Sequence, residues 1–345
     1  MARPLVNLMG DAKPLLNIRS LGRVSPLKGG FTRAQIEVIA RTVRRAPEVM
    51  VKVTGGGTQP GAVAAHLSYV SRKGELDIET DYGERLGREE QKTFLNEWHL
   101  ELSTGQYRGN RSGRRNGRRT KLVHNIVLSM PSPTSPEKVL AASRKFAQEK
   151  FGAKHRYALV LHTDQQHPHV HLVVKAEDNH GRRLHIDKEM LRAWREDFAE
   201  MMREQDVAAN ATPRVVRGRN KRSLKTAIFR AQRRGKSSAM RGRLSEITKE
   251  FAETGTIRDP AKLKLLETRK SVLTDWEKTA KILDDQGEIE LAGDVRYFAK
   301  KMRPVMTDKE DLGLQFLRHL EANRMPGRKQ AETHAAHEQS QDLTR

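Results

Sequence analysis

Three histidines in the segment 162–171 have the residue types and the spacing of a metal site. His169 and His171 are two residues apart in an apolar run, which predicts a strand from which both side chains leave on one face. His162 ends an earlier apolar run, and the short connection predicts an antiparallel hairpin that points this imidazole at the other two. Three neutral imidazoles can hold one divalent cation and leave positions open for substrate. The alternative is a polar hairpin with solvent-exposed histidines.

Imidazole ligands accept manganese, zinc, cobalt or nickel, and tolerate magnesium when phosphate oxygens complete the shell. We expect a divalent cofactor, Mg²⁺ or Mn²⁺. Asp164, inside the connection, is assigned to the catalytic residues with three open roles. It can orient an imidazole, accept a proton, or only shape the turn, and orientation is slightly favoured. For His167, beside the turn, solvent exposure is favoured over a direct role.

The charge of the chain points to a polyanionic partner. Its 345 residues include 65 Lys and Arg against 43 Asp and Glu, a net charge of +22. Nucleic acid is the usual partner at such a charge, and a basic membrane-surface protein is the competing class. The absence of cysteine excludes disulfide scaffolds, Cys-ligated zinc, iron–sulfur clusters and thiol nucleophiles. No apolar run is long enough for a membrane span, so we expect no membrane insertion and a cytoplasmic location.

A metal site in a basic protein suggests phosphodiester chemistry, with water or a side chain as the nucleophile. Tyr69 is one of five tyrosines and lies on a helix predicted to begin near Pro60. It sits roughly 120° from the apolar stripe of that helix. Arg72 and Lys73 follow it and could hold a phosphate. The alternative is that Tyr69 is a core-edge residue with its hydroxyl in water. The rival tyrosines are Tyr82, Tyr107, Tyr157 and Tyr297.

The elements that would position these residues follow from hydrophobic periodicity. Helical spacing and caps predict four helices, and apolar runs predict four strands. This order predicts an α/β sandwich with a largely antiparallel central sheet. In chain order they are a helix at 31–46, a strand at 49–53, a helix from Pro60, a strand at 124–130, a helix from Ser135, strands at 157–162 and 169–175, and a helix at 187–204.

Composition divides the chain into five parts. Residues 1–47 are predicted as a basic arm and helix, 48–213 as the metal-dependent domain and 214–243 as a basic linker with twelve Lys or Arg and no acid. Residues 244–325 are predicted as a helical region and 326–345 as a disordered tail. The core expected in the helical region is Leu263, Leu266, Leu273, Trp276 and Leu283. An acid-free loop at 108–121 offers Arg114, Arg115, Arg118 and Arg119 to phosphates.

Three runs resemble the motifs of conjugative relaxases and mobilization nucleases of the MOB-P class. VTGGGTQPGAVAAHLSYVSRKGELDIE resembles the first motif, HNIVLSMPSPT the second and HTDQQHPHVHLVVKA the third. They occur in family order, and the likeness covers roughly 48–215. Within the class, the runs are especially similar to the Ti-plasmid border endonucleases. The histidine motif is highly specific, the first moderately, and the second is weak alone. The arm and helix before residue 48 and the helical region after the motifs depart from the family pattern.

The resemblance implies an HUH-type fold and a function for each matched residue. Tyr69 matches the nucleophile, His162, His169 and His171 the metal ligands, and Asp164 the motif aspartate. Ser129 matches a serine that contacts DNA near the nick, although it could simply end a strand. The implied reaction nicks origin-of-transfer DNA, held single-stranded at the nick, and leaves a 5′-phosphotyrosyl bond. The implied partners are relaxosome accessory proteins and a type IV coupling protein, with translocation alongside the transferred strand.

Two other functions remain open at this stage. A rolling-circle replication initiator shares the histidine pair and a tyrosine, but usually places the tyrosine after the histidines, whereas Tyr69 precedes them. A non-catalytic, metal-stabilised nucleic-acid-binding protein would require the tyrosine match to be accidental.

Overall fold

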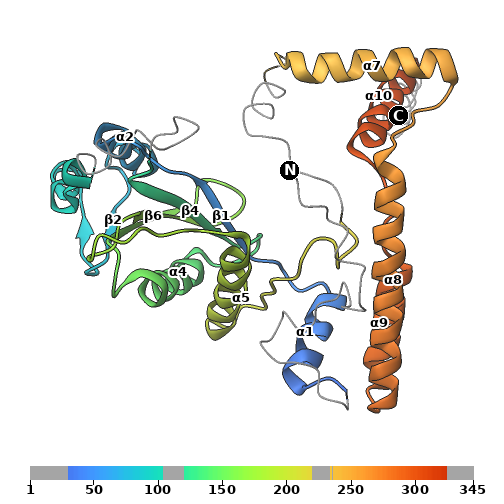
Figure 1. Cartoon of the computed structure of the whole chain (residues 1–345), viewed down its shortest axis with the longest axis horizontal. Helices are drawn as coiled ribbons and strands as arrows, with labels where there is room; N and C mark the ends of the chain where they lie inside the picture. The colour runs from blue at the N-terminus through green and yellow to red at the C-terminus, as the bar shows by residue number, and fades with distance from the viewer. Residues whose placement is uncertain (1–29, 104–119, 220–233, 235, 325–345) are drawn as a thin grey trace, which may run out of the picture. The chain divides into compact units, whose positions relative to one another are not determined.

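The computed structural model describes residues 30–103, 120–219, 234 and 236–324 (Figure 1). The chain forms two compact units, divided between Thr212 and Pro213, and each is described by itself. The predicted arm up to residue 29, the arginines of the 108–121 loop and the tail lie outside the described residues.

The first unit is built on one six-stranded sheet with strand order β1-β4-β6-β5-β2-β3. Every pair of neighbouring strands is antiparallel. The two strands of the histidine motif form the predicted hairpin and lie next to each other within the sheet. The strands are β1 (Met50–Gly55), β2 (Ile78–Thr80), β3 (Arg85–Leu86), β4 (Val123–Ser129), β5 (Tyr157–His162) and β6 (His169–Lys175).

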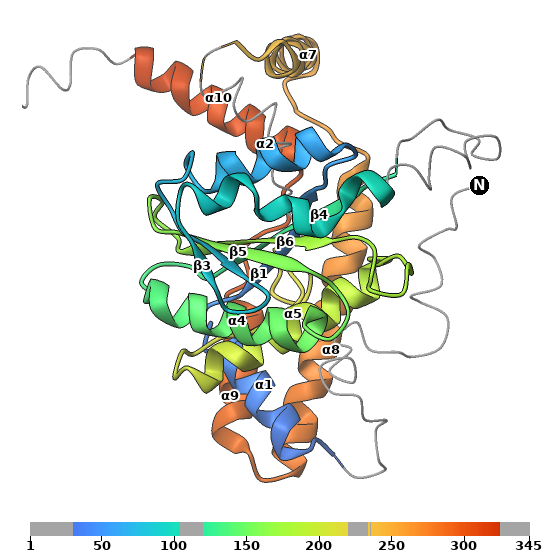
Figure 2. The ribbon, with the colours of Figure 1, turned by 90° about the vertical axis from the view of Figure 1, so that its left-hand side faces the viewer.

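Helices cover both faces of this sheet, as Figure 2 shows. Helix α2 (Pro60–Val70) and the short helices η3 (Glu90–Lys92) and η4 (Phe94–Trp98) lie on one face. Helices α4 (Pro136–Phe151) and α5 (Lys188–Glu204) lie on the other. The predicted α/β sandwich with an antiparallel sheet is confirmed. The unit also contains α1 (Arg33–Val43).

Capping side chains mark where the helices begin. Ser135 caps α4 as predicted: its hydroxyl accepts a hydrogen bond from the Lys138 backbone amide. Asp187 caps α5 in the same way, and Thr32 forms a capping box with Gln35 at the start of α1. Each cap satisfies an amide that has no partner within its helix.

Because side chains alternate along the strands, the sheet has a separate hydrophobic core on each of its faces. One core lies between the sheet and helices α4 and α5, and includes Leu172 and Phe146. The other lies between the sheet and helix α2 and includes Val160, Val173 and Leu67. Successive side chains of a strand point to opposite faces, so odd and even positions of β6 belong to different cores. Strands β2 and β3 were not predicted, because runs of three and two residues are too short to show alternation.

The second unit is helical. Helix α8 (Ala261–Asp285) packs on α9 (Ile289–Lys300) through buried Trp276 and Phe298, whose ring centroids are 5.3 Å apart. Helix α7 (Ser238–Thr254) packs on α10 (Asp308–Arg324). Helix α7 begins inside the stretch that composition predicts to be a basic linker.

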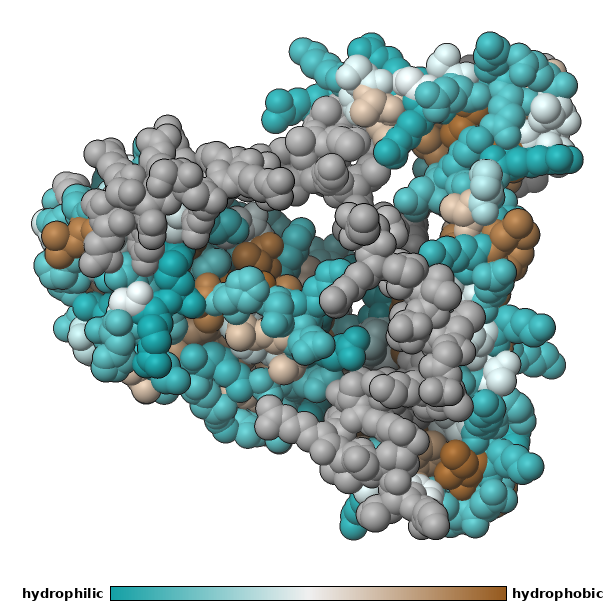
Figure 3. Space-filling model, viewed as in Figure 1, coloured by the Kyte–Doolittle hydropathy of each residue, from teal (hydrophilic) through white to brown (hydrophobic). Residues whose placement is uncertain are grey.

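The predicted core of this unit is wrong for three of its five residues. Trp276 and Leu283 are buried, but Leu263, Leu266 and Leu273 are exposed, Leu263 by 70%. Helix α8 has 25 residues and α9 only 12, so α9 cannot cover the first turns of α8. Leu273 follows buried Val272 and is rotated by about 100° from it around the helix axis, away from the buried side. Figure 3 shows hydrophobic side chains at the surface along these helices.

Candidate active site

The strand register places the three histidines of the motif on one face of the sheet. His162 on β5 lies directly opposite His169 on β6. His171 is two residues further along β6 and therefore on the same face. This is the face that helix α2 covers, because Val160 and Val173 share its core. The predicted convergence of the hairpin imidazoles is thus present.

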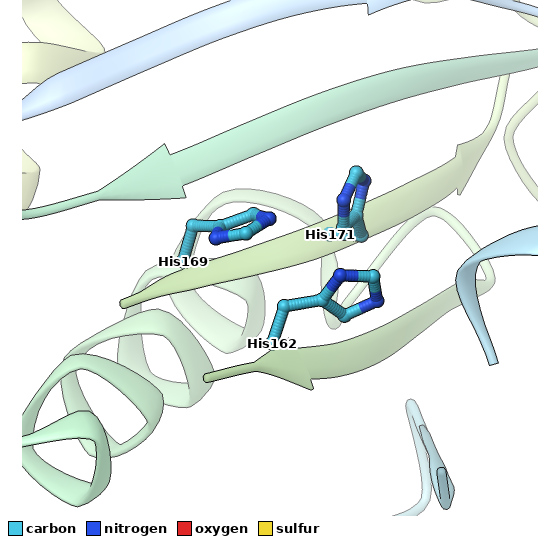
Figure 4. Close-up of side chains that lie close together, drawn as sticks. All are labelled: His162, His169 and His171. Carbon is cyan, nitrogen blue, oxygen red and sulfur yellow. The ribbon is translucent and has the colours of Figure 1, made fainter. Parts of the chain in front are cut away.

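The three imidazoles form a compact cluster (Figure 4). One nitrogen from each ring lies within 4.8 Å of the corresponding nitrogens of the other two. The ring centroids are 4.6 Å apart for His162 and His171, 5.0 Å for His162 and His169, and 5.2 Å for His169 and His171. Within the described part of the chain, no other group of three histidines or acids is arranged for a cation.

Backbone carbonyls fix the tautomers of two of these rings. His162 donates from Nε2 to the carbonyl oxygen of Val70 over 2.6 Å. His169 donates from Nδ1 to the carbonyl oxygen of His167 over 3.1 Å. A carbonyl can only accept, so the lone pairs lie on Nδ1 of His162 and Nε2 of His169, and the first of these also faces the donor Nη2 of Arg72 over 3.4 Å. Those lone pairs are what a cation needs, and the cluster fits a divalent metal with nitrogen ligands.

Burial disfavours the charged form of two of the three imidazoles. It lowers the pKa of His162, and the charges of His169 and Arg72 lower it further against the Val70 hydrogen bond. Burial is also the main cause that lowers the pKa of His171 to about 3, with the neighbouring imidazoles adding to the effect. A neutral imidazole is the form that binds a cation, so these two rings are ready to ligate at neutral pH.

Tyr69 lies in the last turn of α2, off the buried stripe as predicted. Val63, Leu67 and Val70 are buried, whereas Tyr69 is 58% exposed. The guanidinium of Arg72 lies 5.8 Å from the centroid of the Tyr69 ring. The phenol is therefore open to a large substrate and has a cation beside it.

Arg72 joins the tyrosine helix to the histidine hairpin. Its Nη2 donates to Asp164 over 2.5 Å and lies 3.4 Å from Nδ1 of His162. Asp164 Oδ1 is 3.8 Å from the same imidazole nitrogen. Partial desolvation acts to raise the pKa of Asp164, but the charges of Arg72 and His162 outweigh it and lower that pKa. Asp164 is thus an ionised carboxylate at the edge of the cluster.

The turn after α2 has an unusual backbone. Arg72, Lys73 and Gly74 all have positive φ, at 54°, 58° and 91°. The left-handed region costs a non-glycine residue roughly 1–2 kcal/mol. Such strain concentrates at functional sites. The reversal lets Arg72 meet Asp164, while Lys73 is exposed to solvent.

Of the remaining predicted residues, the structure describes Ser129 and His167. Ser129 lies opposite His169 on β4, but it is buried and its hydroxyl donates to the carbonyl oxygen of Pro168 over 3.1 Å. His167 is exposed, and its Nδ1 accepts from the Ser132 amide. Arg114, Arg115, Arg118 and Arg119 lie outside the described residues, as does Tyr107.

The other described tyrosines lie outside helix α2. Tyr157 is buried at the start of β5. Tyr82 is exposed, with the guanidinium of Arg156 4.7 Å from its ring centroid. Tyr297 belongs to α9 in the helical unit.

Two groups near the histidine cluster were not predicted from the sequence. The Val70 carbonyl is a backbone group, and no residue type signals it. His66 precedes Tyr69 by three positions on α2, a helical neighbour spacing that could have suggested it. Its ring centroid is 6.4 Å from that of His171.

No described helix has both the length and the apolar character of a membrane span.

A protein-family model matches the part of the chain that carries the histidine cluster. Residues 70–207 match the family model described as Relaxase, MobA/VirD2-like, nuclease domain. The match includes the three histidines and Asp164, and it begins one residue after Tyr69.

The chain is also similar to individual proteins. It is 29% identical over 214 residues to the T-DNA border endonuclease VirD2 of Agrobacterium fabrum (strain C58), covering 57% of this chain and 46% of that protein. It is 30% identical over 203 residues to VirD2 of Rhizobium rhizogenes, covering 54% and 45%. The chain thus spans somewhat less than half the length of these relatives.

A solved structure described as "Molecular Basis of Vancomycin Resistance Transfer in Staphylococcus aureus" aligns with 49% of this chain and 99% of its own, at TM-score 0.30 and 13% identity. The family match and the antiparallel α/β sandwich agree with the HUH-type fold that the motifs imply. Residues 70–207 thus resemble the nuclease domain of MobA/VirD2-like relaxases, and the chain is similar to the VirD2 border endonucleases.

Proposed function

We propose that this protein is a DNA relaxase that nicks one strand at an origin of transfer by attack of Tyr69. The observation that carries the proposal is the junction between the tyrosine helix and the histidine cluster. The carbonyl of Val70, the residue after Tyr69, holds the His162 imidazole over 2.6 Å. The residue next to the phenol thus holds one candidate ligand, and a phenol and a cation are the two groups that phosphodiester transfer to tyrosine requires.

The reaction balances as follows. The Tyr69 oxygen attacks the scissile phosphorus, the bond from phosphorus to the 3′ oxygen breaks, and a 5′-phosphotyrosyl bond forms. The phenolic proton must leave and the 3′ oxygen must gain one. Asp164 is our candidate acceptor, because the guanidinium that it binds also lies over the Tyr69 ring. The new bond keeps phosphodiester energy, so a free 3′-OH can reverse the step and rejoin the strand.

The residues that would hold a divalent cation are His162, His169 and His171. When bound, such a cation neutralises charge on a phosphate oxygen, and Mg²⁺ or Mn²⁺ is our proposal for it. The protein supplies orientation through the carbonyls of Val70 and His167. Arg72 and Lys73 offer positive charge beside the phenol.

A single-stranded nick region within origin DNA is the proposed substrate, because a net charge of +22 favours a polyanion. Ser129, Arg114, Arg115, Arg118 and Arg119 stay proposals as DNA contacts.

The test is covalent trapping. The chain is incubated with a labelled oligonucleotide library in Mn²⁺ or Mg²⁺ and resolved on a denaturing gel, and the adduct is mapped by peptide sequencing. The wild-type chain should form an adduct at Tyr69. Tyr69→Phe should bind the same DNA and form none, while the matched control Tyr82→Phe should react normally. Normal adduct formation by Tyr69→Phe would defeat the assignment.

The helical unit at 213–345 is proposed to contact relaxosome accessory proteins or the coupling protein of a type IV secretion channel, through which the linked strand is piloted. This proposal is based on a basic stretch that is followed by helices with exposed leucines such as Leu263 and Leu266. A chain ending at Thr212 keeps both cores of the sheet unit and should still nick, but should not support transfer. Full transfer by that truncation would remove the proposal.

A further inference from the structure

The three imidazoles of the cluster are not equally supported. His162 and His169 each donate to a backbone carbonyl, which decides the nitrogen that they present to a cation. His171 has no such support. Its Nδ1 is buried and has no hydrogen-bond partner among the described residues.

A second buried nitrogen without a partner lies nearby. It is Nε2 of His66, on helix α2. The rings of His66 and His171 are neighbours, with centroids 6.4 Å apart and planes inclined by 72°. A buried polar atom without a hydrogen-bond partner is destabilising, because it has lost its water and gained nothing in exchange. Two such atoms on adjacent rings are explained by one hydrogen bond that closes when the rings approach.

We propose that His66 is a positioning residue of the metal site: its Nε2 accepts the Nδ1 proton of His171, which leaves Nε2 of His171 for the cation. The inference rests on the metal site of the proposed function. With this hydrogen bond, each of the three ligand imidazoles donates its N–H to an acceptor and presents its other nitrogen to the cation. Only this direction of the bond suits ligation through Nε2, because an Nδ1 that accepted would leave the proton on Nε2.

The bond also gives α2 a second contact with the cluster. Val70 holds His162 at the last turn of the helix, and His66 would hold His171 one turn earlier. Tyr69 lies between these two contacts in the sequence. The helix that carries the nucleophile would then orient two of the three ligands, so that phenol and cation move together.

The test measures metal affinity and tautomer rather than activity alone. Mn²⁺ binding to the full chain is measured by titration calorimetry for wild type, His66→Leu and His66→Gln. Glutamine keeps an acceptor oxygen near the position of Nε2, and leucine does not. Loss of such a partner typically costs about 10–100-fold in metal affinity. We expect that loss for His66→Leu and near wild-type affinity for His66→Gln. His180→Gln, in an exposed turn, is the matched control and should bind as wild type.

The proton on His171 is observed by long-range ¹H–¹⁵N NMR of histidine-labelled protein with Zn²⁺. The expected wild-type form carries the proton on Nδ1 and the cation on Nε2. A cation on Nδ1 of His171, unchanged affinity in both His66 variants, or equal loss in both overturns the inference. So does a wild-type chain that binds neither ion. A chain that binds Mn²⁺ and responds as expected, yet forms no DNA adduct, would sink the proposed function and leave the role of His66 standing.

Discussion

Nε2 of His162 donates to the carbonyl oxygen of Val70 over 2.6 Å, and both residues are buried. Because Val70 directly follows Tyr69, this bond attaches the last turn of the tyrosine helix to the strand that carries a candidate ligand. A buried hydrogen bond is shielded from competing water. The positions of nucleophile and ligand are therefore linked through the backbone.

Divalent metal should stabilise the sheet unit. A ligand that binds only the folded state adds about 2.7 kcal/mol of stability at a concentration 100 times its dissociation constant. We expect Mn²⁺ to raise the melting temperature and a chelator to reverse the rise and stop nicking. His171→Ala should abolish the thermal shift, while His180→Ala should keep it. Calorimetric melting with and without Mn²⁺ measures both, and a full shift in His171→Ala would contradict the assigned cluster.

Removing the Arg72 guanidinium should affect chemistry more than stability. Asp164 is half exposed, and pairs of that kind add at most about 1 kcal/mol to folding. In the reaction, one charge-assisted hydrogen bond of roughly 1.5–3 kcal/mol corresponds to about ten- to a hundredfold in rate. Arg72→Gln should slow single-turnover adduct formation by that factor, whereas Arg85→Gln, which removes an exposed cation on β3, should not. If Arg72 acts through Asp164, the double variant with Asp164→Asn is no slower than the worse single variant.

Gly74→Ala should loosen the turn behind Arg72. Gly74 has φ of 91°, and an added Cβ would lie 2.6 Å from Cγ and 3.0 Å from Cβ of Arg88. Left-handed backbone alone costs alanine about 1 kcal/mol, and the clash adds to it. Gly83→Ala is the control, since Gly83 has φ of 80° and open space around it. Denaturant unfolding should show the larger loss for Gly74→Ala, and equal losses would mean that Arg88 moves aside freely.

Acid should destabilise the sheet unit partly through His124. Burial, helped by the charge of Lys121, lowers the pKa of His124 to about 4. The unfolded chain, with a pKa near 6.5, binds a proton that the folded chain rejects. Stability from this residue is thus complete above about pH 6.5 and is lost as the pH falls towards 4, by up to about 3 kcal/mol.

His124→Phe keeps a ring on β4 and removes the titration. Calorimetry at pH 7 and 4.5 should show a smaller acid-induced fall for the variant than for wild type. Equal falls in the two proteins would assign the acid sensitivity to other groups.

Local rules predicted most of what depends on periodicity. The two-residue spacing of His169 and His171 fixed their common face, because strand side chains alternate. The exposed position of Tyr69 followed from the helical stripe of α2. The same rules misplaced Leu263 and Leu266, because a stripe shows that a face is apolar and not whether another helix reaches it.

The contacts that join the two halves of the site could be decided only by the tertiary structure. The bonds from Arg72 to Asp164 and from His162 to Val70 each join residues 92 positions apart. Their partners depend on where α2 packs across the sheet and on a left-handed turn at Arg72. Sequence determined which side chains could do the chemistry, because residue type and period are local properties. Packing decided which of them meet, because a hydrogen bond demands atomic positions that no local pattern encodes.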